Sequence, residues 1–566
     1  MMSSIHPAAI LVLGCLALPF LRGKARGAVM VLIPLVGFLN LLFGFETGDS
    51  WTMPLAGFDL EILRVDKLSL LFGYLFHMAA FLAAIYSLHI KDDTQQVSGL
   101  MYAGSAVGTV FAGDLLTLFV FWELMALTSV FQIWARRTPS SLGAGMRYLV
   151  MQVISGLLLL AGAALYFKDT GSISFVHMEL TTTASWVLLG AIGIKCAFPL
   201  AHTWLVDGYP ASTPTGGVFL CAFTTKAAVY ALARGFAGAE VLIWVGSVMA
   251  MFPIFYAVIE NDLRRVLAYS MINQIGFMVV GIGLGEGMGV NGAVAHAFND
   301  VFFKGLLFMS MGAVLLRTGR INGSDLGGLY KSMPWTAGFC MVGAASISAF
   351  PLFSGFVSKS MVMVAAADGG YVYVWMMLLF ASAGVFHHAG IKIPFFAFFA
   401  HDSGLRPKEA PLNMLVAMGI AACLCIGIGC FPEPLYALLP YEVDYAPYST
   451  THVIVQLQIL FFSAMAFATL MLSGVYPPEL RSVNIDTDIV HRRWLPGLWR
   501  ILVMELGGAL RATVTGAFMK ALNSVVDGIT YHYKPGGALA SPWTTGAMVI
   551  WAPALLGFYL LLQFFF

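Results

Sequence analysis

Five lysines and one glutamate lie inside segments that are apolar enough to cross a membrane. They are Lys195, Lys226, Lys304, Lys359, Lys392 and Glu123. A lysine near the middle of such a segment costs roughly 2.5–3.5 kcal/mol on insertion scales, so idle ones are rare. Transporters build their ion sites from charges at this depth, placed beside broken helices. These six residues are therefore the first candidates for function.

Glu123 and Lys195 are expected to form a pair between two neighbouring spans. Burial alone favours the neutral form of each group, whereas pairing keeps both charged. A proton or cation that displaces one partner changes the charge of the other, so the pair can act as a switch. The alternative is a static ion pair that only holds the two spans together. Pro199, four residues after Lys195, is expected to break the helix that carries the lysine.

Lys226 has no acidic residue near it in the sequence. A buried lysine without a dedicated partner loses its proton readily and is suited to carrying protons. The alternative is that the lysine side chain snorkels, so that its ammonium group reaches the membrane surface. Snorkelling requires a position near the end of a span. The predicted depth of Lys226 argues against it.

A third group is the run NGAVAHAFNDVFFKGLLF, in which His296, Asp300 and Lys304 are spaced four residues apart. At 3.6 residues per turn they form one stripe along a helix, which suits a hydrated proton path. A single histidine is usually only a hydrogen-bonded interior residue, but three titratable groups on one face favour function. One His and one Asp do not make a metal site, so neither a metal nor a cofactor is expected.

Two further lysines follow later in the chain. Lys359 ends GFVSK after a second predicted helix break at Pro351 and Gly355, and we interpret it as the counterpart of Lys195. His388 and Lys392 are again four residues apart. Lys392 can serve the end of a proton path, or it can cap the interior end of its helix.

Composition fixes the class of protein. The chain of 566 residues is 59% hydrophobic and 10% charged, and its net charge is +1. It is expected to be an all-α, polytopic membrane protein with about sixteen membrane helices, and no nucleic-acid partner is expected. Arg and Lys outside the spans concentrate in alternate loops, which predicts that both termini face outward from a cell inner (plasma) membrane.

The sequence AFPL occurs twice, in segments predicted to run in opposite directions. This indicates two inverted repeats with broken helices, each forming a proton half-channel. The expected divisions are N-terminal helices (1–96), a first repeat (97–238), a second repeat (239–402), further C-terminal helices (403–475), a cytoplasmic amphipathic lateral segment (476–545) and a final membrane anchor (546–566).

The lateral segment is expected to be helical, with interruptions near Pro496, Gly507 and Gly508. It carries a charge every five to nine residues, which is typical of a helix lying along a membrane surface. It could brace other spans or a neighbouring subunit, or it could only contact lipid.

Together these motifs resemble a known family. The runs GDLLTLFVFWELM, GIKCAFPLAHTWLVDGYPASTPT, DLRRVLAYSMINQIG, HAFNDVFFKGLLFMSMGAV and FPLFSGFVSK resemble the antiporter-like subunits of Mrp-type Na⁺/H⁺ antiporters, the D-type subunit in particular. Related subunits occur in respiratory complex I and in membrane-bound hydrogenases. The resemblance covers about residues 60–430 and implies proton translocation through two half-channels joined by a line of charged residues.

The resemblance also implies roles for individual residues. Glu123, Lys195 and Lys226 match the family's glutamate, broken-helix lysine and central lysine, and Lys359 matches the lysine or glutamate of the second broken helix. His296 and Lys304 match the pattern HxxxHAFFK, whose second histidine is Asp300 in this chain, so the details of proton transfer there differ from the family pattern. The C-terminal layout is similar to a short version of the lateral helix in complex I.

The function expected from the sequence is a proton-translocating subunit of an Mrp-type monovalent cation/proton antiporter. It is expected to be a transporter subunit rather than an enzyme, and its expected partners are other membrane subunits, protons, a cation such as Na⁺, and lipid. Alternatives are a proton-pumping subunit of a complex I-like or hydrogenase complex, or a subunit for inorganic-carbon uptake. A stand-alone redox enzyme is disfavoured because the chain offers neither a cysteine set for an Fe–S cluster nor a Gly-rich nucleotide loop.

Overall fold

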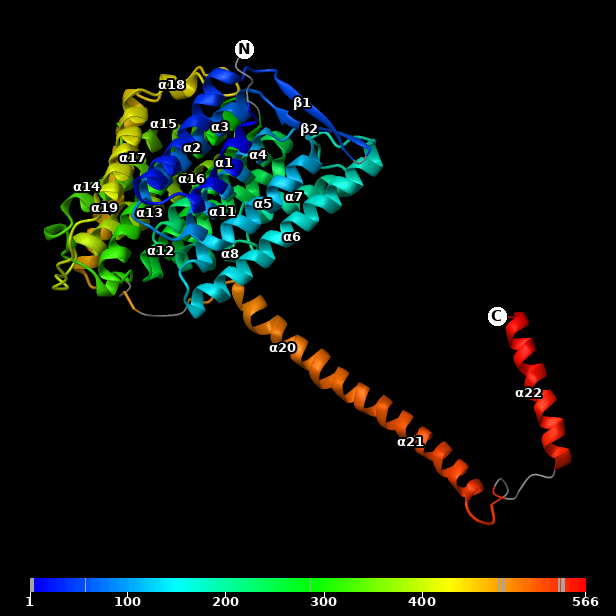
Figure 1. Cartoon of the computed structure of the whole chain (residues 1–566). Helices are drawn as coiled ribbons and strands as arrows, with labels where there is room; N and C mark the ends of the chain where they lie inside the picture. Colours follow the sequence, from blue (N-terminus) through cyan, green and yellow to red (C-terminus); the bar gives the residue numbers. More distant parts are fainter. Residues whose placement is uncertain are drawn as a thin grey trace. The chain divides into compact units, whose positions relative to one another are not determined.

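The computed structural model describes residues 5–565, with gaps at 56, 286, 477–478, 481–483, 538–539 and 541–544. The chain separates into two compact units, residues 1–484 and residues 485–566. In the first unit the helices lie side by side in one bundle (Figure 1). The core of this bundle is apolar, and it encloses the buried lysines.

The first half of the bundle consists of helices of different lengths and contains one β-hairpin. In chain order it contains α1 (Pro7–Gly14), η1 (Cys15–Phe20), α2 (Gly23–Gly44), β1 (Ser50–Leu55), β2 (Phe58–Arg64), α3 (Lys67–Tyr86), α4 (Asp93–Phe111), α5 (Leu115–Trp134), α6 (Pro139–Thr170), α7 (Thr183–Lys195), α8 (Thr203–Ala211), α9 (Gly216–Ala222) and α10 (Thr224–Gly235).

The second half of the bundle is helical throughout. It contains α11 (Glu240–Ile259), α12 (Leu263–Leu284), α13 (Met288–Thr318), η2 (Gly323–Asp325), η3 (Leu329–Lys331), α14 (Pro334–Ile347), α15 (Ser354–Asp368), α16 (Val372–Val385), the π-helical η4 (Phe386–Lys392) and η5 (Phe395–Phe399), α17 (Leu412–Cys430), α18 (Glu433–Tyr436) and α19 (Thr450–Leu472).

Thirteen of the described helices are long and apolar enough to cross a membrane. Two shorter helices, Pro7–Phe20 and Thr183–Lys195, are also apolar. The structure therefore shows a polytopic helical membrane protein. The count of about sixteen spans remains a prediction, as do the inverted orientation of the repeats and the outward-facing termini.

The hairpin of β1 and β2 was not predicted. The strands are antiparallel, with Ser50 opposite Arg64. The Arg64 side chain donates to the carbonyl oxygens of Gly113 and Phe175, each at 2.7 Å. These bonds join the hairpin to the loop before α5 and to the loop after α6. The sequence analysis does not anticipate this hairpin, because two short strands between membrane spans leave little trace in hydropathy; the fold is otherwise helical, as expected.

The second unit consists of one long helical run and a separate helix. The run comprises η6 (Val490–Trp494), α20 (Leu495–Trp499), η7 (Arg500–Leu506) and α21 (Gly507–Tyr533), followed by α22 (Thr545–Phe565). The helix was expected, but the interruptions at Pro496 and Gly507 are not breaks. At these points the chain changes between π-helical and α-helical turns and continues. Its position along a membrane surface stays a prediction.

The two AFPL sequences form helix breaks with the same backbone conformation. Ala197 and Leu200 have φ of 60° and 72°, and Ala349 and Leu352 have φ of 57° and 74°. Positive φ costs non-glycine residues about 1–3 kcal/mol each, so it persists only where the surroundings impose it. Helices α7 and α8 flank the first break, and α14 and α15 flank the second.

The second break differs in one respect from the sequence prediction. Pro351 lies in the break, but Gly355 lies inside α15. A Cβ atom at Gly355 would overlap the carbonyl oxygen of Ser346. This glycine therefore allows the start of α15 to pass close to α14 and does not itself interrupt the helix.

Helices α11 and α12 pack closely through glycines, which leads to a stability prediction. A Cβ atom at Gly276 would overlap the backbone nitrogen of Ala250, so Gly276→Ala must force the helices apart. We expect a destabilisation of about 1–3 kcal/mol, measured as a lower Tm of the purified protein in detergent. Gly338→Ala in α14 is the control, because its added methyl group meets open space. Equal Tm values for the two variants would contradict this packing.

Candidate functional site

Lys195 is the last residue of α7 and is fully buried. Its Nζ donates to the carbonyl oxygen of Trp122 at 2.5 Å and lies 4.5 Å from the centroid of the Trp122 ring. The Trp122 indole donates to Ser155 Oγ at 3.0 Å, and Ser155 donates to the carbonyl of Ala191 at 2.6 Å. The ammonium group is thus held where α5, α6 and α7 meet.

Glu123 lies beside this group but turns toward α6. Its Oε1 is buried without a hydrogen-bond partner among the described residues, and it occupies the space beside Gly156, where a Cβ atom would overlap that oxygen. The direct ion pair with Lys195 that the sequence predicted is not among the contacts of the described residues. Instead the Lys195 ammonium donates to the Trp122 carbonyl, and the absence of a side chain at Gly156 leaves room for the Glu123 carboxylate.

Lys226 does have a carboxylate partner, contrary to the sequence interpretation. Its Nζ lies 2.5 Å from Asp300 Oδ2, and both side chains are completely buried. The same ammonium donates to the carbonyl of Cys221 at 3.2 Å, near the end of α9. The partner was missed because Asp300 lies on α13, far away in the sequence. The pair joins α10 to α13.

The predicted stripe on α13 is present as three buried side chains that contact polar groups on neighbouring helices. Asp300 faces Lys226 of α10. His296 Nδ1 lies 3.1 Å from Ser358 Oγ of α15, and its Nε2 lies 3.1 Å from Gln274 Oε1 of α12. The stripe therefore connects α10, α12 and α15 through polar groups.

Lys304 and Lys359 are also fully surrounded by protein. Lys304 Nζ donates to Ser270 Oγ of α12 at 2.8 Å. Lys359 Nζ donates to the carbonyl oxygen of Ile347 at 2.9 Å and lies 5.2 Å from the ring centroid of Phe277. Both ammonium groups are thus solvated by neutral protein oxygens.

Lys359 is not the positional counterpart of Lys195. Lys195 ends the helix before the first break, whereas Lys359 lies in the helix after the second break. The residue that ends the helix before the second break is Ile347. Its carbonyl accepts a hydrogen bond from Lys359. The lysine at the first break thus lies in the preceding helix, and the lysine at the second break lies in the following helix.

His388 and Lys392 lie in η4, where α16 changes to π-helical turns. Such turns are rare and frequently mark functional sites. Lys392 Nζ donates to the carbonyls of Val258 and Glu260 at 2.6 and 2.7 Å and lies 2.9 Å from Glu479 Oε1. His388 is completely buried, and neither ring nitrogen has a hydrogen-bond partner among the described residues.

Several residues of this arrangement were missed in the sequence. Ser270, Gln274 and Ser358 contact the candidate groups, and Glu479 pairs with Lys392. The signal for the first two was available, because the run SMINQIG places polar residues inside an apolar span. No comparable signal marks Glu479, which follows the last helix of the bundle.

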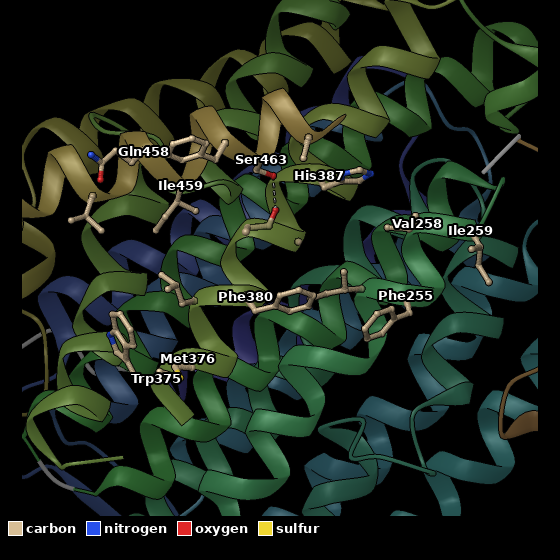
Figure 2. A pocket seen from close by; sticks show the side chains of 17 residues that line it. Phe255, Val258, Ile259, Trp375, Met376, Phe380, His387, Gln458, Ile459 and Ser463 are labelled. Atoms are coloured by element: carbon tan, nitrogen blue, oxygen red, sulfur yellow. Dashed lines mark hydrogen bonds between the residues drawn. The ribbon is translucent and has the colours of Figure 1, made fainter. Parts of the chain in front are cut away.

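A cavity of about 970 Å³ lies between α11, α16 and α19, near this end of the site. Figure 2 shows its walls, which are formed by side chains such as Phe255, Trp375, Phe380 and Ile459. Among the described residues that line it there is no carboxylate and no ammonium group. An apolar wall of this kind suits a hydrocarbon chain and not a proton path.

Known proteins are similar to this chain in sequence and in fold. Residues 112–387 match the family model described as NADH:quinone oxidoreductase/Mrp antiporter, transmembrane. The A-type subunit of the Na⁺/H⁺ antiporter of Alkalihalophilus pseudofirmus is 30% identical over 484 residues, which cover 74% of this chain and 60% of that protein. The A-type subunit of Bacillus subtilis is 31% identical over 409 residues, covering 63% and 51%. The chain thus spans about half to three fifths of these relatives.

Two solved structures share the fold. A chain of the Mrp complex from Dietzia sp. DQ12-45-1b matches with a TM-score of 0.76 and 22% identity, covering 92% of this chain and 62% of that one. A chain of an archaeal membrane-bound sulfane sulfur reductase matches with a TM-score of 0.72 and 21% identity, covering 98% and 99%.

These findings do not support the narrower resemblance to the D-type subunit, because both antiporter relatives are A-type subunits. The agreement in fold extends over nearly the whole chain, and the sequence match includes the first helix break, the central pair and the second break. Residues 112–387, which contain these features, are thus similar to the transmembrane family shared by NADH:quinone oxidoreductases and Mrp antiporters.

Proposed function

We propose that this chain is a proton-translocating subunit of a multisubunit monovalent cation/proton antiporter in the plasma membrane. The observation that carries the proposal is the completely buried Lys226–Asp300 pair. Burying two charges is expensive, and their attraction rarely repays the cost in stability alone. A buried ion pair between two helices of a membrane bundle is therefore better explained by a role in proton transfer than by a gain in stability.

The proposed path follows the buried titratable groups. Protons pass Glu123 and Lys195 in the first half-channel and reach the Lys226–Asp300 pair. The second half-channel continues from this pair along α13. Its members are Lys304, His296, Lys359, His388 and Lys392. Residues 97–238 and 239–402 contain one half-channel each.

The antiporter is favoured by the named relatives, which are subunits of Na⁺/H⁺ antiporters. A proton-pumping subunit of a redox complex is the second candidate. The observation that favours it is the match in fold with a respiratory membrane complex, which covers nearly all of both chains and includes the C-terminal region. Purification from native membranes distinguishes them: small hydrophobic partner subunits support the antiporter, and Fe–S subunits support the redox complex.

Loss of a path lysine is expected to abolish transport. Lys195→Ala and Glu123→Ala should each eliminate cation-dependent proton flux in inverted vesicles, measured with a pH-sensitive dye, while the complex still assembles. Lys331→Ala is the matched control, because Lys331 is exposed and pairs with Asp402 at the surface. Normal flux in either path variant would overturn the proposed function.

The central pair allows stability and transport to be separated. Asp300→Asn alone leaves Lys226 buried without its carboxylate and should cost roughly 3–5 kcal/mol of stability. The double variant Lys226→Met/Asp300→Leu fills the same space with apolar groups and should recover the Tm without recovering proton flux. Recovery of flux in the double variant would show that the pair is only structural.

Gly156 offers a test of the Glu123 position that leaves every titratable group in place. Gly156→Ala puts a methyl group where the Glu123 carboxylate lies, so the carboxylate must move. We expect reduced proton flux with an assembled complex. Gly190→Ala in α7 is the control, because its added methyl group meets open space. Equal flux in the two variants would argue against a role for this carboxylate position.

A further inference from the structure

The ammonium group of Lys392 contacts three backbone carbonyls, whereas Lys195, Lys226 and Lys359 each donate to one. The Lys392 ammonium lies at the C-terminal end of α11 and donates to the carbonyls of Ala257, Val258 and Glu260. These belong to the last turn of a helix, where carbonyl oxygens lack intrahelical partners and attract cations. The fourth contact is the carboxylate of Glu479, at 2.9 Å.

Glu479 comes from outside the predicted path. It lies in the segment after α19, and its side chain is 7% exposed, whereas that of Lys392 is completely buried. The carboxylate thus covers the lysine from the side of the surface. Asn484 donates to Glu260 Oε2 at 3.2 Å, so a second residue that follows α19 contacts the end of α11.

Glu479 also lines a separate cavity of about 310 Å³ whose wall is partly polar, called the polar cavity below. Ser324 and His401 contribute polar groups to its walls, and Phe396 and Tyr476 contribute rings. His401 and Gly474 are exposed, so the cavity reaches the protein surface. Glu479 is therefore in contact with the buried lysine and with a water-accessible space.

Aromatic side chains pack on one side of this position. Tyr476 stacks on His387 with ring centroids 5.7 Å apart, and it packs against Phe467 at 5.3 Å. His387 also borders the large cavity of Figure 2, but the walls of that cavity are apolar. Of these two cavities, the smaller one has Glu479 in its wall and the larger one does not.

We propose that Glu479 is the group through which Lys392 exchanges protons with water, an inference that rests on the proposed function. In the outward step of this exchange, a proton leaves the Lys392 ammonium for the Glu479 carboxylate. The neutral amine keeps its place on the carbonyls of α11, and a neutral carboxylic acid forms. The acid then gives the proton to water in the polar cavity and returns to a carboxylate. Uptake follows the reverse sequence.

The first test compares Glu479→Gln with Asp402→Asn. Gln keeps the size and the acceptor oxygen of Glu479 but cannot carry a proton in this way, so flux in vesicles should fall by about 100-fold. Glu479→Asp should retain part of the flux. Asp402 also pairs with a lysine, at 2.8 Å, but both side chains are at least 40% exposed, so Asp402→Asn should transport normally. Normal flux in Glu479→Gln would overturn the proposal.

A second test separates proton exchange from a structural role. Glu479→Cys should be inactive and should react with a membrane-impermeant thiol reagent through the polar cavity. Modification with a carboxyethyl methanethiosulfonate restores a carboxylate and should recover flux, whereas the methyl reagent, which is neutral, should not. The unaltered chain treated with the same reagents controls for Cys423, which is exposed. Recovery with the neutral reagent, or failure to react, would contradict the proposal.

The proposed function and the role of Glu479 fail under different outcomes. If Lys195→Ala abolishes flux and Glu479→Gln does not, the proposed function stands and the role of Glu479 is wrong. If Lys195→Ala retains full flux, the proposed function is wrong and the role of Glu479 falls with it. The thiol reaction at position 479 is measured without transport, so it tests the water-accessible position independently.

Discussion

Each lysine buried in this bundle must replace the water around its ammonium group, and the structure meets that requirement largely with helix ends. The acceptors for Lys226, Lys359 and Lys392 are carbonyls at the ends of α9, α14 and α11. Carbonyls in the last turn of a helix have no intrahelical partner and carry the negative end of the helix dipole. Broken helices therefore do more than bend the chain, because each break creates acceptors in the interior of a membrane protein, where water is scarce.

The two AFPL breaks show how the sequence produces such ends. Proline removes a backbone donor and cannot continue the preceding turn, and the flanking alanine and leucine adopt left-handed conformations in both copies. The same hydrogen bond precedes each break, from Phe198 to Gly193 and from Phe350 to Ala345. Equal strain at two distant sites indicates that one local solution is used twice. The lysines, however, reach the two breaks from opposite sides, so the copies share a backbone and differ in their chemistry.

Much of this arrangement could be predicted from the sequence, and the failures have a common cause. Hydropathy located the helices, and the four-residue spacing placed His296, Asp300 and Lys304 on one helix. Partners were predicted poorly, because they depend on which helix faces meet. Asp300 was assigned to a stripe of its own helix, yet it binds Lys226 of α10. The role of Glu479 could not be predicted for the same reason, since nothing in its local sequence indicates that its carboxylate contacts Lys392.

The contacts divide the buried lysines into two chemical kinds. Lys226 and Lys392 each have a carboxylate within 3 Å, whereas Lys195, Lys304 and Lys359 donate to neutral oxygens. A lysine on a neutral oxygen can lose its proton and keep its hydrogen bond, and no anion is left behind. A lysine paired with a carboxylate can lose its proton at low cost only if the carboxylate receives it or the pair separates. The paired lysines, Lys226 and Lys392, would thus control transfer, and the lysines on neutral oxygens would conduct protons to and from them.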